Sequence, residues 1–189
     1  MKSRVSAVVK RCDDISKAIK ETYSYQHNIK IVGMPLLAQW ESLEQTAVLC
    51  LWLFVALGIK DVSIQDIDMA DRLSARKPSK QPNPINCKFT RRLAKVKVMA
   101  VRREVSNLQA TQLGFESQVI LNSLNILDHL TPRLQELLRE SKKFKEANNF
   151  NCCRVRKGMI FLRKSEASEV IKLNKIEHLT ALQKDEWTS

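Results

Sequence analysis

The stretch Asn28-Ile-Lys-Ile-Val-Gly33 alternates apolar and polar side chains and runs into Met34-Pro35. Alternation of this kind, closed by a turn signal, predicts a β-strand with one buried face. The apolar run that follows, from about Trp40 to Leu57, predicts a long helix that ends with Gly58 as its C-cap. A strand followed by a helix opens a β-α-β arrangement, and the remaining elements are predicted outward from there.

The residues downstream complete this arrangement with three more strands and a second helix. The sequence predicts a second strand at Val62 to Leu73 with an irregular middle, a proline-containing loop at Ser74 to Pro84, and a third strand at Ile85 to Phe89. A basic amphipathic helix is predicted from Arg91 to about Val105, with four apolar side chains available to a core: Leu93, Val96, Val98 and Val101. Val119-Ile-Leu121 is the expected fourth strand. The order β-α-β-β-α-β over Asn28 to about Ile126 is that of a ferredoxin-like sandwich, so the expected fold class is α+β.

The N-terminal residues predict an amphipathic helix with an apolar seam. Six residues recur in steps of three and four, as the a and d positions of a coiled coil do: Val5, Val8, Cys12, Ile15, Ile19 and Thr22. The seam covers about two and a half heptads, which is too short for a stable coiled coil alone. We therefore expect residues 1–26 to be the remnant of a longer coiled-coil stalk, and a homo-oligomer wherever the full stalk is present.

A second, smaller unit is predicted after residue 126. Thr131-Pro132 is typical of a helix start, with Thr as the N-cap and Pro at the first helical position. A β-hairpin is predicted from Cys152 to Arg163 around Lys157-Gly158, then a short strand at Val170 to Leu173 and a last helix at Ile176 to Leu182. The expected domains are the stalk remnant at 1–26, the β-α-β-β-α-β domain at 27–126 and a C-terminal α-β-hairpin-α domain at 127–189.

Composition narrows the class of protein. The chain has 189 residues, with 32 Lys and Arg against 20 Asp and Glu, and its five cysteines do not form the even-numbered framework of a small secreted protein. The N-terminus has no secretory signal, and the longest uncharged run, Gln45 to Ile59, is shorter than the ~20 residues that span a bilayer. We expect an intracellular protein, nuclear or cytoplasmic, with no membrane partner.

The positive charge is concentrated in two segments. Arg91 to Arg103 holds six basic residues and no acid, and Arg133 to Lys164 holds ten basic residues and three acids. A local basic surface on an otherwise neutral chain is typical of a protein that binds a phosphate backbone. A solvated helix face has the same pattern, and charge alone does not choose between the two.

Residue patterns for catalysis or metal binding are weak. Asp66, Asp68 and Asp71 could chelate a divalent ion, but no second carboxylate cluster accompanies them, and a solvent-facing strand edge explains them better. The adjacent Cys152 and Cys153 point to opposite faces of a strand, which suits one core thiol and one exposed thiol. The sequence has no P-loop and no nucleophile elbow. We therefore expect no enzymatic activity, no cofactor and no metal.

Three aromatic side chains of the apolar helix are predicted to belong to the core: Trp40, Trp52 and Phe54. If Trp40 or Trp187 is exposed, it becomes a candidate for base stacking.

Several stretches resemble known families. Ser24-Tyr-Gln-His-Asn-Ile-Lys-Ile-Val-Gly-Met-Pro35 resembles the start of the RRM-like domain in the first-open-reading-frame RNA-binding proteins of LINE-type retrotransposons. Asp66 to Leu73 and Pro84 to Phe89, followed by Arg91-Arg92, are similar to a later part of the same domain.

The C-terminal part resembles the FP (few polyhedra) protein of baculoviruses and its insect transposon-borne relatives. The similar stretches are Leu130-Thr-Pro-Arg-Leu-Gln-Glu-Leu-Leu138, Cys153-Arg-Val-Arg-Lys-Gly-Met-Ile-Phe-Leu-Arg-Lys164 and Ser168-Glu-Val-Ile171. Together the two resemblances cover Tyr23 to Leu182.

The resemblance implies a non-enzymatic protein of retrotransposon or viral origin that binds single-stranded nucleic acid, RNA in preference to DNA, with little sequence preference. Its binding residues would be basic side chains of both domains, which can follow a phosphate backbone. In the RRM-like domain the candidates are Arg72, Lys88, Arg91, Arg92, Lys95, Arg102 and Arg103. In the FP-type C-terminal domain they are Lys142, Lys143, Arg154, Arg156, Lys157, Arg163 and Lys164.

Two departures from the family patterns bear on the mode of binding. Tyr25-Gln26 replaces a basic pair that often precedes the Asn-Ile strand, and Cys153 or Arg154 stands where many relatives carry an aromatic residue. An ordinary RRM stacks bases on aromatics of its central strands, whereas the strands of the RRM-like domain here offer only Phe89. Contact with the phosphate backbone is therefore favoured over base stacking.

The alternative is a structural or protein-interaction role in a viral capsid or a transposition complex. In that case the basic faces would dock acidic partners. Phosphate binding should fall steeply with ionic strength, whereas binding to an acidic protein should show a shallower and partner-specific dependence.

Overall fold

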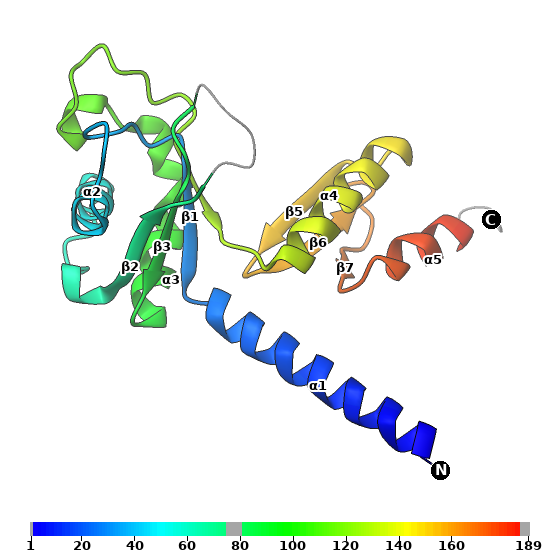
Figure 1. Cartoon of the computed structure of the whole chain (residues 1–189). Helices are drawn as coiled ribbons and strands as arrows, with labels where there is room; N and C mark the ends of the chain where they lie inside the picture. The colour runs from blue at the N-terminus through cyan, green and yellow to red at the C-terminus, as the bar shows by residue number, and fades with distance from the viewer. Residues whose placement is uncertain (1, 75–80, 186–189) are drawn as a thin grey trace. The chain divides into compact units, whose positions relative to one another are not determined.

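The computed structural model describes residues 2–74 and 81–185 (Figure 1). The chain divides after His129 into two compact units, each with a hydrophobic core of its own. Both units combine helices with an antiparallel sheet, which confirms the predicted α+β class.

The first unit holds four strands in the order β2-β3-β1-β4, and each neighbouring pair is antiparallel. Its helices and strands are α1 (Lys2–Tyr25), β1 (Asn28–Val32), α2 (Leu43–Ala56), β2 (Ile67–Arg72), β3 (Ile85–Phe89), α3 (Arg92–Val101) and β4 (Asn125–Asp128). Short 3-10 helices lie before β2, η1 (Ile64–Asp66), and between α3 and β4, η2 (Arg102–Asn107) and η3 (Ala110–Leu113).

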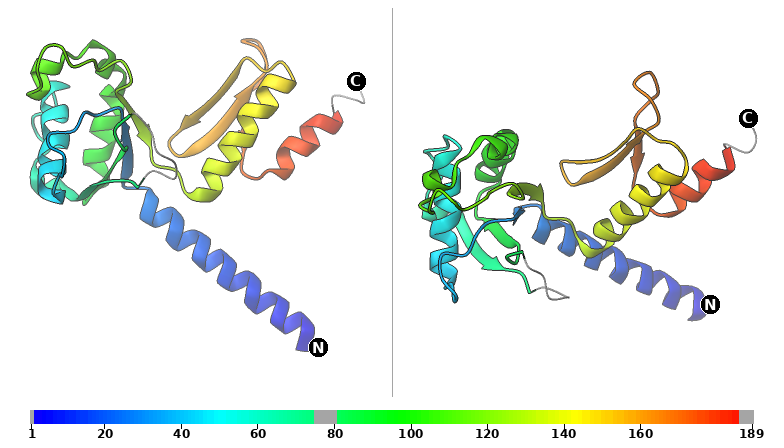
Figure 2. Two further views of the ribbon diagram at one scale, coloured as in Figure 1. Left: turned by 45° about the horizontal axis from the view of Figure 1, so that its top comes forward. Right: turned by 90° about the horizontal axis from the view of Figure 1, so that it is seen from above.

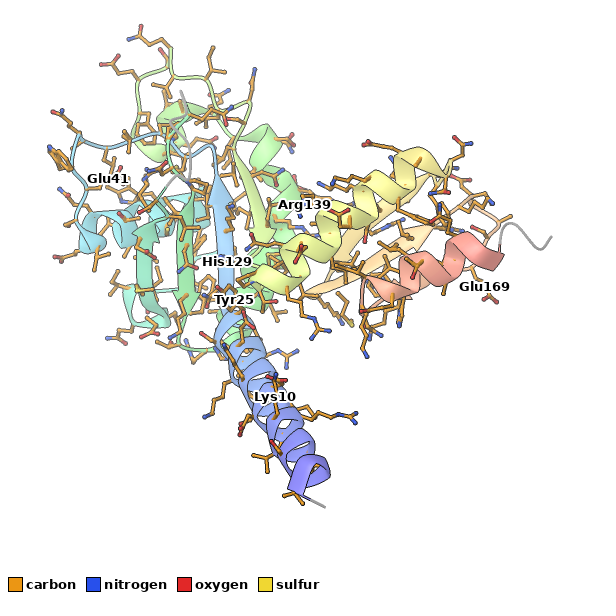
Figure 3. The ribbon with its side chains drawn as sticks, turned by 45° about the vertical axis from the view of Figure 1, so that its right-hand side comes forward. Lys10, Tyr25, Glu41, His129, Arg139 and Glu169 are labelled. Carbon is orange, nitrogen blue, oxygen red and sulfur yellow. The ribbon has the colours of Figure 1, made fainter. Side chains whose placement is uncertain are left out.

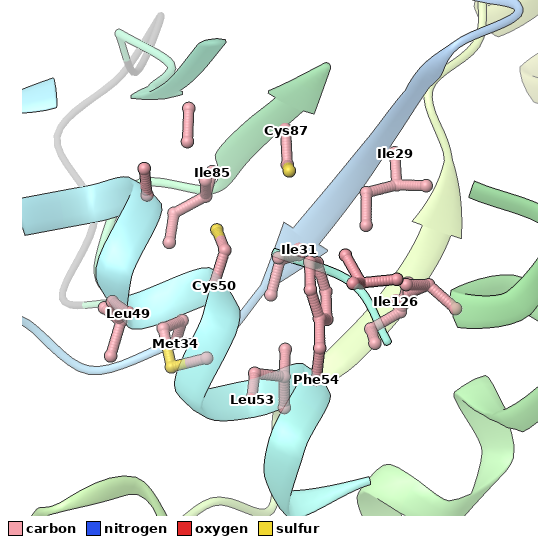
Figure 4. Packing of buried hydrophobic residues seen from close by; sticks show 14 of the residues in the cluster. Ile29, Ile31, Met34, Leu49, Cys50, Leu53, Phe54, Ile85, Cys87 and Ile126 are labelled. Atoms are coloured by element: carbon pink, nitrogen blue, oxygen red, sulfur yellow. The ribbon is translucent and has the colours of Figure 1, made fainter. Parts of the chain in front are cut away.

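One face of the four-stranded sheet forms the core of the first unit. Ile29 and Ile31 of β1 are fully buried, as is Ile126, which lies opposite Ile31 on β4. Phe54 of α2 packs in the same cluster (Figure 4). Val98 of α3 also belongs to it, so both helices cover the same face. Each buried side chain of this size contributes about 1.5–3 kcal/mol, and this face therefore holds the two layers together.

Capping residues determine where α2 begins and ends. The Ser42 hydroxyl accepts the Gln45 N–H while the Gln45 side chain accepts the Ser42 N–H, which makes a capping box. After the last turn, Gly58 takes the left-handed conformation, with φ +82°. The helix therefore begins after Trp40, later than predicted.

The aromatic residues around α2 are less buried than predicted. Phe54 lies in the core, but Trp52 and Val55 face solvent, because a helix packed on one sheet buries only one side. Trp40 precedes the helix and is 85% exposed, so its predicted place in the core is wrong. Trp187 lies outside the described residues.

The fourth strand lies later in the chain than predicted. Val119-Ile-Leu121 is not a strand, and its Ile120 is 74% exposed. The strand is β4, whose register with β1 places Ile126 in the core. The three consecutive apolar residues thus misplaced the strand, because its position is determined by pairing with β1.

The second strand and the basic helix are also shorter than predicted. β2 begins only at Ile67, because the Asp66 carboxylate accepts the Ser63 N–H and closes η1 in front of it. α3 ends at Val101 and continues as η2. Leu93 and Val96 do not reach the core: both are exposed, since Ala94 and Val98 occupy the side of α3 that faces the sheet.

The second unit contains the predicted elements. They are α4 (Pro132–Ala147), β5 (Cys152–Arg156), β6 (Met159–Arg163), β7 (Ile171–Leu173) and α5 (Glu177–Asp185). Thr131 is the N-cap of α4, and its hydroxyl accepts the Leu134 N–H. Lys157 and Gly158 take φ values of 52° and 70°, as the two-residue turn of a type I′ hairpin requires. β6 pairs with both β5 and β7, and α4 lies along one face of this sheet (Figure 2).

The seam of α1 faces outward in the described structure. Its described apolar side chains are exposed: Val5, Val8, Ile15 and Ile19. The side chain of Thr22 lies outside the described residues. Among the described helices, none is both long and apolar enough to cross a membrane.

The close approach of Gly33 to the backbone of Ser123 gives a stability prediction. Gly33 has φ +75°, and a Cβ placed on it would overlap the Ser123 carbonyl, whereas Gly58 has a similar φ and no atom within 4 Å of such a Cβ. Gly58→Ala should therefore cost about 1–2 kcal/mol from its left-handed backbone alone. Gly33→Ala should cost clearly more, as measured by urea unfolding. Equal losses in the two variants would contradict the close approach.

Candidate nucleic-acid interface

Arg72, a predicted phosphate contact, is fully occupied inside the first unit. Its Nε and Nη2 donate to the Glu41 carboxylate at 2.9 and 3.1 Å (Figure 3 labels Glu41). Nη1 donates to the carbonyls of Met34 and Asn83, and Nη2 to that of Pro35, at 2.7 to 3.0 Å. These contacts use the donor capacity of a guanidinium group. Arg72 therefore fastens β2 to the segment before α2, and we correct its predicted role.

The same contacts determine the pKa of Glu41. Burial raises this pKa, but hydrogen bonds from Arg72, the Leu37 N–H and the Thr46 hydroxyl, together with the charge of Arg72, outweigh burial and lower the pKa below its ordinary value. Since the folded-state pKa is the lower one, this contribution to stability is present above the ordinary carboxyl pKa. It is lost as the pH falls through the lowered pKa.

Lys95 is also removed from the interface by a buried acid. Its Nζ lies 3.0 Å from Asp128 at the end of β4, and the two side chains are 13% and 9% exposed. A cation in a buried pair of this kind cannot turn to a phosphate without leaving a carboxylate uncompensated. We correct this prediction as well.

Lys88 and Arg91 lie at the surface but face carboxylates. Lys88 Nζ lies 2.6 Å from Asp68, and Arg91 forms an ion pair with the buried Asp66.

The Ser63 N–H, and then Arg91, hold the pKa of Asp66 below its ordinary value. The prediction of a solvent-facing edge is therefore wrong for Asp66. Within the described residues, no group of three or more His, Cys, Asp or Glu side chains could hold a metal ion.

Three predicted cations of the first unit remain without an acid in the described residues: Arg92, Arg102 and Arg103. Arg102 is half-buried and donates to the Met99 carbonyl at 3.1 Å. Arg92 and Arg103 are exposed, but Arg92 begins α3 and Arg103 lies in η2, beyond the end of a ten-residue helix about 15 Å long. They can contribute separate phosphate contacts but no compact site.

The face of the first sheet that points away from α2 and α3 carries a polar cluster. Asn86 Oδ1 accepts from Asn28 Nδ2 at 3.3 Å and from His129 Nδ1 at 2.7 Å, and Asn86 Nδ2 donates to Asp71 at 3.2 Å. Tyr25 stands edge-on to the His129 ring, with centroids 4.9 Å apart (Figure 3). Burial, aided by the charge of Lys30, lowers the pKa of His129. The cluster is therefore neutral apart from Asp71 and suits structure better than phosphate binding.

Phe89 does not face this polar cluster. It points into the core, is 1% exposed and packs on Phe54 with ring centroids 5.7 Å apart. The aromatic residue that the strands of the first unit offered for base stacking is thus enclosed, whereas Trp40, the candidate outside the strands, is exposed.

The second unit has a basic sheet face instead. Inward side chains of its strands, such as Ile160 and Leu162, are fully buried against α4. The outward positions, which we call the outer sheet face, are Cys152, Arg154, Arg156, Met159, Phe161, Arg163 and Lys172. Four of these are cations and none is acidic. Lys157 adds a further positive charge at the hairpin turn.

The cations of the outer sheet face have no carboxylate partner in the described structure. Arg154 donates Nε–H to Cys152 Sγ at 3.2 Å, and Arg163 donates to the Ser168 carbonyl at 3.2 Å. The side chains of Arg156 and Lys172, and that of Lys157 at the hairpin turn, have no hydrogen bond or ion pair among the described residues. The positive charge of this face is therefore open to a ligand.

The other predicted cations of the second unit, Lys142, Lys143 and Lys164, lie outside the outer sheet face. Lys143 lies 3.1 Å from Glu140, which also pairs with Arg139 on α4 (Figure 3 labels Arg139). Lys142 is exposed on the same helix. Lys164 Nζ lies 5.9 Å from the centre of the Phe150 ring. The exposed surface of α4 thus mixes both signs, unlike the outer sheet face.

Two residues of the outer sheet face were missed from the sequence: Phe161 and Lys172. The alternation of Met159–Arg163 around the buried Ile160 and Leu162 could have placed Phe161 outward. Lys172 lies between the inward Ile171 and Leu173 and follows the same rule.

The predicted division of the cysteines agrees with this register. Cys153 packs in the core and burial raises its pKa, while Cys152 lies on the outer face.

Comparison with known proteins adds no assignment. No model of a protein family matches this chain, and no curated protein has a matching sequence.

The ion pair of Arg72 and Glu41 gives a second stability prediction. Arg72→Ala should lower the free energy of unfolding by about 3–5 kcal/mol near pH 7, because it leaves the buried Glu41 charge uncompensated. The loss should shrink in acid, since protonation of Glu41 relieves the variant and weakens the pair in the wild type. Urea unfolding at neutral and acidic pH measures both effects.

The matched control for this experiment is Lys97→Ala, which removes an exposed ion pair with Asp61 in the same unit. It should change stability far less. If the Arg72 and Lys97 variants lose the same stability, or if the Arg72 deficit does not depend on pH, the structural role of Arg72 is contradicted.

Proposed function

We propose that this protein binds single-stranded nucleic acid, RNA in preference to DNA, without catalysing a reaction. The observation that carries the proposal is the outer sheet face, where four cations stand on three paired strands with no acid among them. Cations on a surface of this kind bind phosphates by charge and release counterions, with little dependence on sequence. Arg92 and Arg103 of the first unit would add peripheral contacts.

The proposal includes a family origin and an assembly. The strand order β2-β3-β1-β4, with both helices on one face, is the arrangement expected of a split βαβ, ferredoxin-like sandwich, and supports an RRM-like first unit. The sequence stretches similar to LINE-type and baculovirus FP proteins support a retrotransposon or viral origin. The exposed seam of α1 supports a coiled-coil remnant that would join copies of the chain when the full stalk is present.

A second function is favoured by exposed apolar side chains. Trp52 and Val55 of α2 and Leu93 and Val96 of α3 face solvent in the first unit. Exposed apolar surface is typical of protein contacts. The protein would then be a structural component of a capsid or transposition complex, with its basic faces docked on acidic partners.

Fluorescence anisotropy with labelled single-stranded RNA, single-stranded DNA and duplex DNA tests the first function. The wild type should bind single strands and lose affinity steeply between low and physiological salt. Changing both Arg154 and Arg156 to Ser should weaken binding and reduce the slope of log K against log salt by about 1.4, as expected for two lost phosphate contacts.

The control changes Arg133 and Arg139 of α4 to Ser, which alters the net charge equally on a surface of mixed sign. This variant should retain most of the affinity and the salt slope of the wild type. Equal losses in the two variants would show that net charge alone drives binding. No binding of any nucleic acid at low salt would overturn the proposed function and leave the protein-interaction role.

A further inference from the structure

The outer sheet face has an aromatic residue at its centre. Phe161 lies on the middle strand, and the register places it opposite Arg154 on β5 and opposite Lys172 on β7. Neighbouring strands lie about 4.8 Å apart, so the ring stands in the middle of a row roughly 10 Å wide with a cation at each end. Met159 and Arg163 flank it along β6.

Phe161 does not belong to the hydrophobic core of the second unit. Ile160 and Leu162, on either side of Phe161 in the chain, are fully buried in the core. Phe161 points to the opposite face of the sheet and is half-buried. The cation–π contact found within the described residues is that of Lys164 with Phe150. Arg154 instead directs its Nε–H to Cys152, so the face of the Phe161 ring is not used by that neighbour.

We propose that Phe161 is a base-stacking residue, and that a nucleobase lies on its ring while Arg154 and Lys172 hold the phosphates on either side. This inference rests on the proposed function and names the class of ligand: a strand whose bases are unpaired. Aromatic stacking tolerates any base, because every base has a π face, and it is denied to a duplex, whose bases already stack on one another. The preference for single strands is thus assigned to one side chain of the second unit.

The stacking and the phosphate contacts can be separated with three probes of equal length. They are an unstructured single strand, a strand with the same phosphate backbone but abasic at each position, and a duplex. The wild type should bind the base-bearing strand more tightly than the abasic strand. Phe161→Ala should weaken binding of the base-bearing strand by about 5- to 150-fold, equivalent to about 1–3 kcal/mol per stacked base. It should leave the weaker binding of the abasic strand unchanged.

Further variants separate stacking from shape and from folding. Phe161→Tyr should restore the preference for the base-bearing strand, whereas Phe161→Leu, which keeps an apolar side chain, should not. Tyr23→Ala removes an exposed aromatic residue of α1 and should leave the preference intact. Circular dichroism and urea unfolding of each variant identify a loss that comes from misfolding.

The outcomes distinguish the two proposals. If the wild type binds the abasic and base-bearing strands equally, the stacking proposal fails while the phosphate-binding function stands. If Phe161→Ala weakens both probes alike, or if Phe161→Leu retains the preference, stacking on this ring is again overturned. If the wild type binds neither strand at low salt, the proposed function itself fails.

Discussion

β1 is paired along both edges, with Ile31 opposite Ile85 of β3 on one side and Ile126 of β4 on the other, and the first unit depends on this pairing. Because side chains alternate along a strand, this register turns all three residues into the core under α2 and α3. A slip by one residue would expose them and bury Lys30. The pairing of β1 with β4 also brings two residues that are far apart in sequence together: Gly33, just after β1, lies against Ser123, just before β4.

The same folding that builds the first core also consumes its charges. Arg72 and Lys95 arrive beside Glu41 and Asp128, carboxylates that are themselves almost enclosed. An enclosed carboxylate needs a cation, and a cation held in this way contributes to stability and not to binding. The basic composition of the segment around α3 therefore overstated its capacity for nucleic acid. Local charge counts treat each side chain as free, whereas acids distant in sequence neutralise several of them.

Elements with a local cause were predicted well, and elements decided by distant contacts were not. Thr131-Pro132 starts α4 and Lys157-Gly158 closes the hairpin, because an N-cap and a left-handed turn depend on a few adjacent residues. The place of β4 depends on which residues can pair with β1, and the sequence pattern favoured the apolar Val119-Ile-Leu121 over Asn125–Asp128. The burial of Arg72 could not be predicted either, since Glu41 lies 31 residues away. Phe161 is an intermediate case: its outward position follows from alternation, but its place between two cations needs the pairing of β7.

The outer sheet face shows how a small unit can keep so much like charge together. Cations directly opposite one another on paired strands are destabilising. Here each cross-strand pair of the hairpin on this side joins a cation to a neutral residue: Cys152 with Arg163, Arg154 with Phe161, and Arg156 with Met159. Lys172 is likewise paired with the neutral Phe161. Repulsion between the cations is reduced because neutral side chains separate them across the strands. No carboxylate on this face neutralises their charge. In the first unit, Arg72 and Lys95 are instead neutralised by enclosed carboxylates, and the exposed Arg92 and Arg103 stand apart from each other. The outer sheet face therefore gathers more unpaired cations on one surface than the first unit does.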